Sequence, residues 1–249
     1  MRTIAAAALA ATALGAGSAA TAQEAAGGWR LAATVYAWLP ALSSSLDTEV
    51  GTLDGDVSSG DVISNLDFAF MGALEARTGR WGLIGDLIYS DISADGSTPR
   101  GLLFTKGVAQ SEMTVFSGYA TYRLHEDERV AFDAGVGLRG FSVDLDFTLK
   151  GNLARTRSFG DDQSWVVPLV AARAIVTFSD HWAGEIMADL GGTGSDETTW
   201  QALAILRYDI NDRWSAVAAY RYMDIEYQID DKDASIELYG PAIGVTYRF

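Results

Sequence analysis

The chain has 249 residues, with 18 basic and 33 acidic side chains and a formal net charge of −15 at pH 7. This acidic balance argues against nucleic acid as a partner, because phosphate binding needs a basic face. The absence of cysteine excludes the disulfides that stabilise many small secreted domains, so stability must come from another source, such as a closed hydrogen-bonded sheet.

The N-terminal residues predict export from the cytoplasm. A short basic start, Met1-Arg2-Thr3, precedes an apolar, alanine-rich run over residues 4–15, and Ala20-Thr21-Ala22 matches a cleavage site. These features predict a signal peptide over residues 1–22 and a single domain over residues 23–249. The apolar run is too short for a spanning helix, and no later stretch offers the ~20 uncharged apolar residues that such a helix needs.

After residue 23, hydrophobic side chains alternate with polar or small ones, which is the period of a β-strand. In residues 214–222, for example, Trp214, Tyr220 and Tyr222 share one face and Arg221 lies on the other. The alternation predicts about ten strands, over residues 29–39, 66–77, 81–91, 111–124, 129–146, 164–178, 181–191, 198–209, 213–228 and 236–249. The first loop is long enough to hide a further hairpin, so eight or twelve strands remain possible.

The connections between these strands are of two kinds. The short polar turns are Thr78–Arg80, His125–Glu128, Ser179–His181 and Asn211–Arg213, and the longer polar loops cover residues 41–65, 92–110, 147–163, 192–197 and 229–235. Short periplasmic turns and longer extracellular loops are typical of outer-membrane barrels. We therefore predict an all-β fold, an antiparallel transmembrane β-barrel with both ends of the barrel sheet on the periplasmic side.

Tryptophan recurs where the outward-running strands begin. A residue next to a short turn would lie at the membrane–water boundary, where the amphipathic ring of Trp or Tyr is favoured. The residues predicted to act as interfacial anchors are Trp29, Trp81, Trp182, Trp214, Tyr247 and Phe249. The alternative interpretation is that these rings form the core of a soluble β-sandwich.

The face opposite the aromatic residues is charged, which favours the barrel. A sandwich could not bury so many charges cheaply, whereas a narrow barrel can pair arginine with carboxylate across its lumen. The predicted lumen network comprises Arg30, Asp67, Glu75, Arg77, Asp86, Arg123, Asp133, Arg139, Arg173, Glu185, Asp189, Arg207, Asp209, Arg221 and Arg248. Bulky side chains share this face, so we expect them largely to fill the lumen; they are Tyr36, Trp38, Met71, Ile84, Ile88, Tyr119, Trp165 and Met187.

The last residues, IGVTYRF over 243–249, resemble the terminal strand of Gram-negative outer-membrane barrels. In that class a final Phe, preceded by apolar or aromatic residues at alternate positions, is the signal read by the barrel-assembly machinery, and the resemblance implies this role for Phe249. The chain from residue 23 resembles the small opacity-type and OmpW-like barrels. Residues 36–46 and 61–83 also look like those of an uncharacterised bacterial outer-membrane family.

Some outer-membrane barrels are enzymes, and the chain can be compared with them. Omptin proteases use an Asp/His arrangement, and lipid A deacylases and phospholipases use Ser with His, at the outer side of the membrane. Here His125 and His181 are the two histidines, and both fall in short turns at the predicted periplasmic end. We therefore predict no catalytic residues and no cofactor. We also predict no metal site, because residues 54–61 (DGDVSSGD) lack the glycine of a calcium loop at its sixth position, where Ser59 stands.

These observations predict a non-enzymatic outer-membrane protein that is structural or interacts through its surface loops. The alternative is a narrow, porin-like channel for small solutes, and an outer-membrane hydrolase is the least favoured interpretation. The expected partners are outer-membrane lipid, lipopolysaccharide and the barrel-assembly machinery, and the protein is expected to be a monomer.

Overall fold

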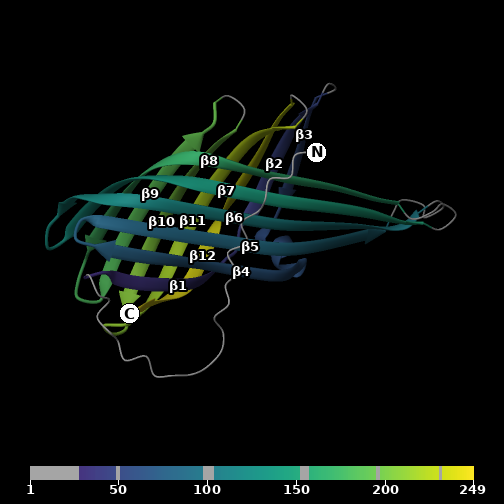
Figure 1. Ribbon diagram of the computed structural model, residues 1–249. Helices are drawn as coiled ribbons and strands as arrows, with labels where there is room; N and C mark the ends of the chain where they lie inside the picture. The colour runs from purple at the N-terminus through teal and green to yellow at the C-terminus, as the bar shows by residue number, and fades with distance from the viewer. Residues whose placement is uncertain (1–27, 49–50, 98–103, 152–156, 195–196, 230–231) are drawn as a thin grey trace.

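A computed structural model describes residues 28–48, 51–97, 104–151, 157–194, 197–229 and 232–249 (Figure 1). The predicted signal peptide, residues 1–22, lies outside this part of the chain. The described residues form one antiparallel sheet and one short helix. The elements are β1 (Arg30–Trp38), β2 (Ala41–Thr48), β3 (Gly51–Val57), α1 (Ser59–Ser64), β4 (Leu66–Thr78), β5 (Trp81–Ser97), β6 (Phe104–Glu126), β7 (Val130–Gly151), β8 (Arg157–Thr177), β9 (Trp182–Gly192), β10 (Thr198–Asp209), β11 (Trp214–Ile229) and β12 (Lys232–Arg248).

The sheet closes into a barrel because β1 pairs with two strands. One edge of β1 pairs with β4 and the other with β12, from Ala32 opposite Arg248 to Trp38 opposite Ala242. The remaining strands pair in chain order from β4 to β12. The barrel therefore has ten strands, β1 and β4–β12, and the predicted all-β antiparallel barrel is confirmed. No helix in the described ranges is long and apolar enough to cross a membrane.

The first predicted loop, residues 41–65, is not an open loop where the structure describes it. β2 continues the line of β1 and pairs with β12, and β3 folds back on β2. Helix α1 follows, and the Ser58 hydroxyl caps it by accepting a hydrogen bond from the backbone N–H of Asp61 at 3.2 Å. The hairpin that the sequence left open thus exists, outside the ten-stranded barrel.

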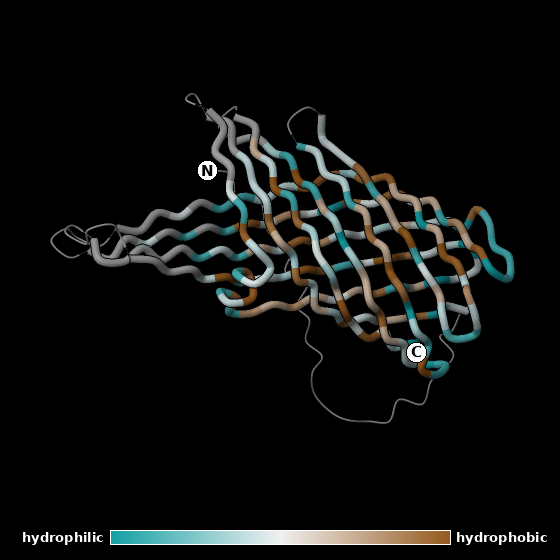
Figure 2. The backbone as a smooth tube through the Cα atoms, turned by 180° about the vertical axis from the view of Figure 1, so that it is seen from behind, coloured by the Kyte–Doolittle hydropathy of each residue, from teal (hydrophilic) through white to brown (hydrophobic). Residues whose placement is uncertain are grey.

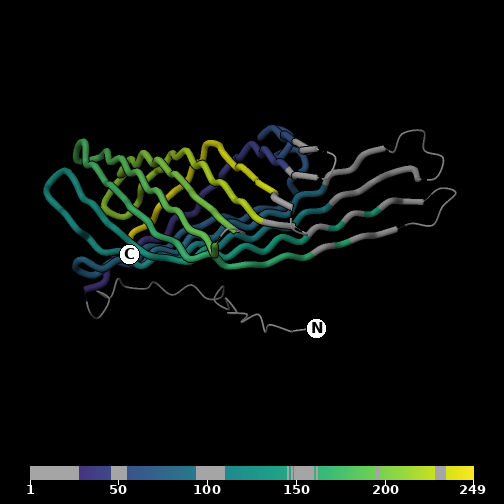
Figure 3. The backbone as a smooth tube through the Cα atoms, turned by 90° about the horizontal axis from the view of Figure 1, so that it is seen from above, coloured from purple at the N-terminus to yellow at the C-terminus, as the bar shows by residue number. Residues whose placement is uncertain are grey.

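Several strands also run further than the hydrophobic alternation predicted. β5 and β6 pair as far as Ser97 opposite Lys106, and β7 and β8 pair as far as Leu149 opposite Arg157. Residues 92–97, 104–110, 147–151 and 157–163 of the two predicted loops are therefore strand, because the ladder is made by backbone groups and needs no apolar face in water. Figures 1 and 3 show β5–β8 projecting together beyond the barrel, and Figure 1 shows the β2–β3 hairpin projecting in another direction.

The other end of the barrel, which we call the short-turn end, holds four tight connections and the C-terminus of β12. In the turn after β6, the backbone N–H groups of Arg129 and Val130 each donate to Asp127 Oδ1 at 2.8 Å. These hydrogen bonds, together with one from His125, lower the pKa of the Asp127 carboxyl to about 2. In the turn after β10, Asn211 Oδ1 accepts hydrogen bonds from the N–H groups of Arg213 and Trp214, both at 2.9 Å.

The barrel wall separates two chemically different faces. Large apolar side chains point outward and are exposed, among them Val35 at 61% and Leu74 at 66%, and Figure 2 shows hydrophobic positions along the barrel strands and hydrophilic ones at the hairpin ends. Next to the short turns, aromatic rings meet across strands: Trp81 and Tyr122 lie 5.0 Å apart, and Trp214 and Tyr247 lie 4.8 Å apart. All six predicted anchors are present on this side of the wall, but their role at a membrane boundary stays a prediction.

Candidate functional site: the barrel lumen

An apolar layer fills the half of the lumen that lies away from the short turns. All ten barrel strands contribute to this layer, which we call the plug, because alternate side chains of each strand point inward. Its buried members are Trp38, Met71, Ile88, Val115, Tyr119, Phe141, Val167, Leu169, Met187, Met223, Ile225, Leu238 and Ala242, and Leu203 of β10 packs against them. All eight predicted bulky residues belong to the plug or pack on it.

Three aromatic rings continue the plug toward the projecting strands. The ring of Phe141 stacks on Trp165 with centroids 4.8 Å apart, and Trp165 stacks on Tyr227 at 5.4 Å. Phe141 and Trp165 belong to the neighbouring strands β7 and β8, whereas Tyr227 belongs to β11, on the far side of the short hairpin formed by β9 and β10. The stack therefore connects β7 and β8 with β11 across the lumen, beyond the ends of β9 and β10.

The most deeply buried ion pair lies beside the plug. Arg139 Nη2 and Asp189 Oδ2 are 2.9 Å apart, and both side chains are fully buried. Tyr119 donates its hydroxyl to Asp189 at 2.8 Å and accepts from Arg139 at 2.9 Å, and Gln201 Nε2 donates to Asp189 at 3.0 Å. Ser117 and Thr199 accept from the remaining guanidinium nitrogens, so the charge is surrounded by hydrogen bonds that offset its desolvation.

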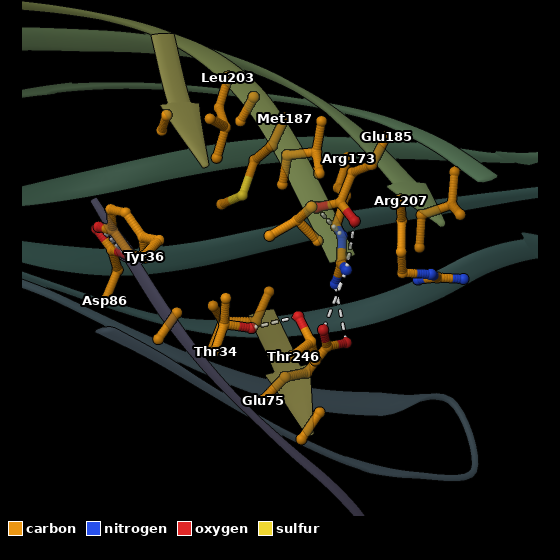
Figure 4. Close-up of a pocket in the computed structure, with 18 of the residues that line it drawn as sticks. Thr34, Tyr36, Glu75, Asp86, Arg173, Glu185, Met187, Leu203, Arg207 and Thr246 are labelled. Atoms are coloured by element: carbon orange, nitrogen blue, oxygen red, sulfur yellow. Dashed lines mark hydrogen bonds and ion pairs between the residues drawn. The ribbon is translucent and has the colours of Figure 1, made fainter. Parts of the chain in front are cut away.

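A second cluster lies closer to the short turns. Asp133 is sandwiched between Arg77 and Arg123, with Arg77 Nη2 at 2.6 Å from Asp133 Oδ2. Arg173 forms a bidentate ion pair with Glu75, in which Nη1 and Nη2 donate to the two carboxylate oxygens at 2.9 and 3.0 Å. Its Nε lies 2.7 Å from Glu185 Oε1. Figure 4 shows Arg173 between its two carboxylates. Such planar, bidentate pairing is a property of arginine that lysine lacks.

A third group connects to the plug. Arg221 lies 3.1 Å from Asp86 and donates to the Tyr36 hydroxyl at 3.0 Å, while that hydroxyl donates to Asp86 at 2.7 Å. The Arg221 guanidinium also lies 5.3 Å from the ring centres of Tyr36 and Trp38, within the range of a cation–π interaction.

A fourth group lies at the mouth of the short-turn end. Arg207 Nε is 3.2 Å from Asp209 Oδ1, and Arg248 Nη2 contacts the same oxygen. Ser215 donates to that oxygen at 2.7 Å and accepts from Arg248 at 2.5 Å. One carboxylate oxygen is thus shared between two arginines.

Two members of the predicted network lie outside these groups. Asp67 is exposed at the β-bulge between Leu66 and Phe68, where the register of β4 against β5 shifts. Arg30 is exposed at the first residue of β1, directly opposite another arginine, Arg77. Because directly opposed residues share one face of a sheet, Arg30 lies on the lumen face with Arg77, whereas the bulge interrupts the alternation at Asp67. Neither residue forms an ion pair within the described part of the chain, and their membership of the network stays a prediction.

Some members of the networks were not predicted. Ser117, Thr199, Gln201 and Ser215 are buried polar residues of the lumen, and each occupies an inward position in the alternation that was used to find the arginines. The alternation therefore predicted that these side chains point inward, but nothing in the sequence indicated which charged residue each would contact.

A cavity of about 260 Å³ lies between the plug and the mouth. Its apolar wall includes Ile84, Leu203, Ile205, Val217 and Ala219, and its polar wall includes residues of the last three groups (Figure 4). Side-chain exposure falls along the lumen from Arg207 at the mouth, 32%, to Asp86, 13%, and Arg221, 6%. Solvent therefore reaches the wall of this cavity most at the mouth, whereas Asp133 of the second cluster, which also lies near the short turns, is 1% exposed.

The two histidines lie at this same short-turn end and are exposed. His125 Nε2 is 3.1 Å from Asp127, and His181 Nδ1 is 2.9 Å from the backbone oxygen of Asp209. Among the described residues there is no group of three or more His, Asp or Glu side chains arranged to hold a metal ion.

No family model and no curated protein matches the chain. Among solved structures, it resembles the outer membrane protease OmpT from Escherichia coli with a TM-score of 0.57 and 10% identity, covering 88% of this chain and 97% of that one. The translocator domain of the autotransporter NalP from Neisseria meningitidis (TM-score 0.41, 13% identity, 89% of each chain) and the attachment invasion locus protein Ail of Yersinia pestis (0.32, 15%, 90% of this chain and 99% of that one) are less similar. At these identities the likeness to OmpT shows the fold alone, and the two lower scores carry no argument. The chain therefore has the fold of an outer-membrane β-barrel.

Proposed function

We propose that this protein is a non-enzymatic outer-membrane barrel that does not conduct solutes and acts as a structural component or through its projecting strands. The observation that carries the proposal is the plug, to which nine barrel strands contribute buried side chains and β10 contributes the partly buried Leu203. A close-packed apolar layer leaves little room for water, and moving ions through it would require desolvation.

The non-enzymatic part of the proposal is supported by the position of the histidines. A hydrolase of the kinds compared above needs a His as general base near its nucleophile or its attacking water. His125 lies near the end of β6 and His181 in the turn between β8 and β9, both at the end of the barrel remote from the projecting strands. Outer-membrane lipid and lipopolysaccharide as partners, recognition of Phe249 by the barrel-assembly machinery, the monomeric state, the signal peptide and the kinship with small opacity-type and OmpW-like barrels belong to this proposal as well.

Single-channel recording in planar bilayers tests it. The folded wild-type protein should give no steady openings, whereas a variant with Phe141→Ala and Met223→Ala, which removes two large plug side chains, should conduct. A control with Val136→Ala, which removes an exposed outward side chain, should stay silent.

The second candidate is a narrow channel, favoured by the charged and partly solvated lumen next to the plug. Steady openings of the wild-type protein that change with Arg123→Ala or Arg173→Ala would establish the channel and overturn the closed barrel.

A further inference from the structure

The cavity between the plug and the mouth is large enough to hold a small organic molecule. An apolar cavity of ~150 Å³ is enough to bind a benzene molecule, and this one measures about 260 Å³. Leu203 and Ile205 point into it from β10, below Gln201 and above Arg207. Leu203 and Arg207 are four residues apart on one strand, which corresponds to ~14 Å along the strand. An extended chain would therefore fit the long axis better than a compact ring.

The charged groups inside the cavity already have partners. Glu75 and Glu185 are both bound to Arg173, and Asp86 is bound to Arg221 and Tyr36. Each of these carboxylates is thus already paired with an arginine. A charged ligand would gain little by binding either the carboxylates or these arginines.

The mouth is different, because it has unmatched positive charge. Arg207 and Arg248 share the single carboxylate of Asp209, so two positive charges face one negative charge within this group. Arg248 also donates to Ser215 and to the backbone oxygen of Asp212. Arg207, in contrast, has Asp209 as its sole ion-pair partner in the described part of the chain, and its buried Nε lacks an acceptor in hydrogen-bond geometry.

We infer that the lumen binds a linear carboxylate of about six to eight carbons, which enters from the short-turn end. Its alkyl chain lies in the cavity against Leu203, Ile205 and Val217, and its carboxylate pairs with Arg207 at the mouth. The arrangement supplies what an amphiphilic anion needs, namely an apolar wall inside and an incompletely paired guanidinium at the entrance. This site is independent of the proposed closed barrel, because the plug lies on the other side of the cavity.

Calorimetric titration of the barrel, folded in lipid nanodiscs, with octanoate tests the inference. Octanoate should bind at least tenfold more tightly than butanoate, because each buried methylene contributes ~0.8 kcal/mol, or about fourfold in Kd. Arg207→Gln should weaken octanoate binding about tenfold, whereas Arg213→Gln, which changes an exposed arginine in the neighbouring turn, should leave it unchanged. Equal effects of the two substitutions, or equal binding of octanoate and octylammonium, would overturn the inference.

Two further measurements locate the ligand. Nuclear Overhauser contacts should connect octanoate methylenes with the methyl groups of Leu203 and Ile205; contacts only with outward-facing Leu206 would mean partition into lipid and would contradict the cavity site. Leu203→Phe should fill the cavity and abolish binding while keeping every charge, and it serves as the second variant if Arg207→Gln does not fold. Undiminished binding by Leu203→Phe would also refute the site.

Discussion

Arg139 holds a positive charge in the lumen with no solvent contact, and its partners explain how this is tolerated. Its guanidinium nitrogens contact Ser117, Tyr119, Asp189 and Thr199. Burying a charge is costly, but its carboxylate partner and the hydrogen bonds to every guanidinium nitrogen offset much of that cost, although Asp189 Oδ1 has no hydrogen-bond partner. The pair is therefore expected to matter most when one partner is removed.

Arg139→Met should lower the free energy of unfolding by about 3–5 kcal/mol, because it leaves Asp189 buried and unpaired. Urea unfolding of the detergent-folded barrel, followed by tryptophan fluorescence, measures the loss. Arg213→Met, at an exposed position, is the matched control and should change stability little. The double substitution Arg139→Met with Asp189→Leu should recover much of the loss, and a double variant as unstable as the sum of the two single ones would contradict this account.

Strand β7 shows how a single element positions the lumen chemistry. Two glycines separate two charged residues at successive inward positions: Asp133, Gly135, Gly137 and Arg139. A Cβ atom at Gly137 would lie 2.3 Å from the backbone oxygen of Gly118 and 2.8 Å from the ring of Tyr119. The glycine therefore makes room for Tyr119, whose hydroxyl then reaches Asp189.

Gly137→Ala should destabilise the barrel by about 1–3 kcal/mol, because the added methyl forces backbone or ring to move. Gly140→Ala on the same strand is the control, since its Cβ would meet only the Val166 side chain at 3.9 Å. Both changes reduce the freedom of the unfolded chain alike, so the difference between them isolates the clash. Equal stability of the two variants in urea unfolding would show that the close approach is unimportant.

At the scale of the whole molecule, the two ends of the barrel differ in length and composition. One end has turns of a few residues, and the other has β5–β8 and the β2–β3 hairpin projecting in different directions (Figure 1). Outer-membrane barrels place short turns in the periplasm and longer segments outside. This rule sets the expected orientation, and with it the side from which the cavity is reached.

Labelling of single introduced cysteines tests the orientation. The chain has no cysteine of its own, so no other residue of the protein reacts with the maleimide. On intact cells, a membrane-impermeant maleimide should label Asp144→Cys in the projecting part of β7. It should label Asp180→Cys, in the turn between β8 and β9, only after the outer membrane is permeabilised. The reverse labelling pattern would contradict the expected orientation and would show that the mouth of the cavity lies at the cell surface.

The sequence alone determined which side chains face the lumen, because successive residues of any strand point to opposite faces whatever the strand's partners. It therefore predicted the ten strands, the aromatic rings beside the short turns and the inward arginines. Only the tertiary structure decided which charges meet. Arg173 and Glu75 lie on β8 and β4, and Arg139 and Asp189 on β7 and β9, strands that are not neighbours in the sheet. The cavity and the shared Asp209 likewise depend on how the sheet curves and closes. Contacts across the lumen follow from the stagger of the closed barrel, which no local pattern of residues encodes.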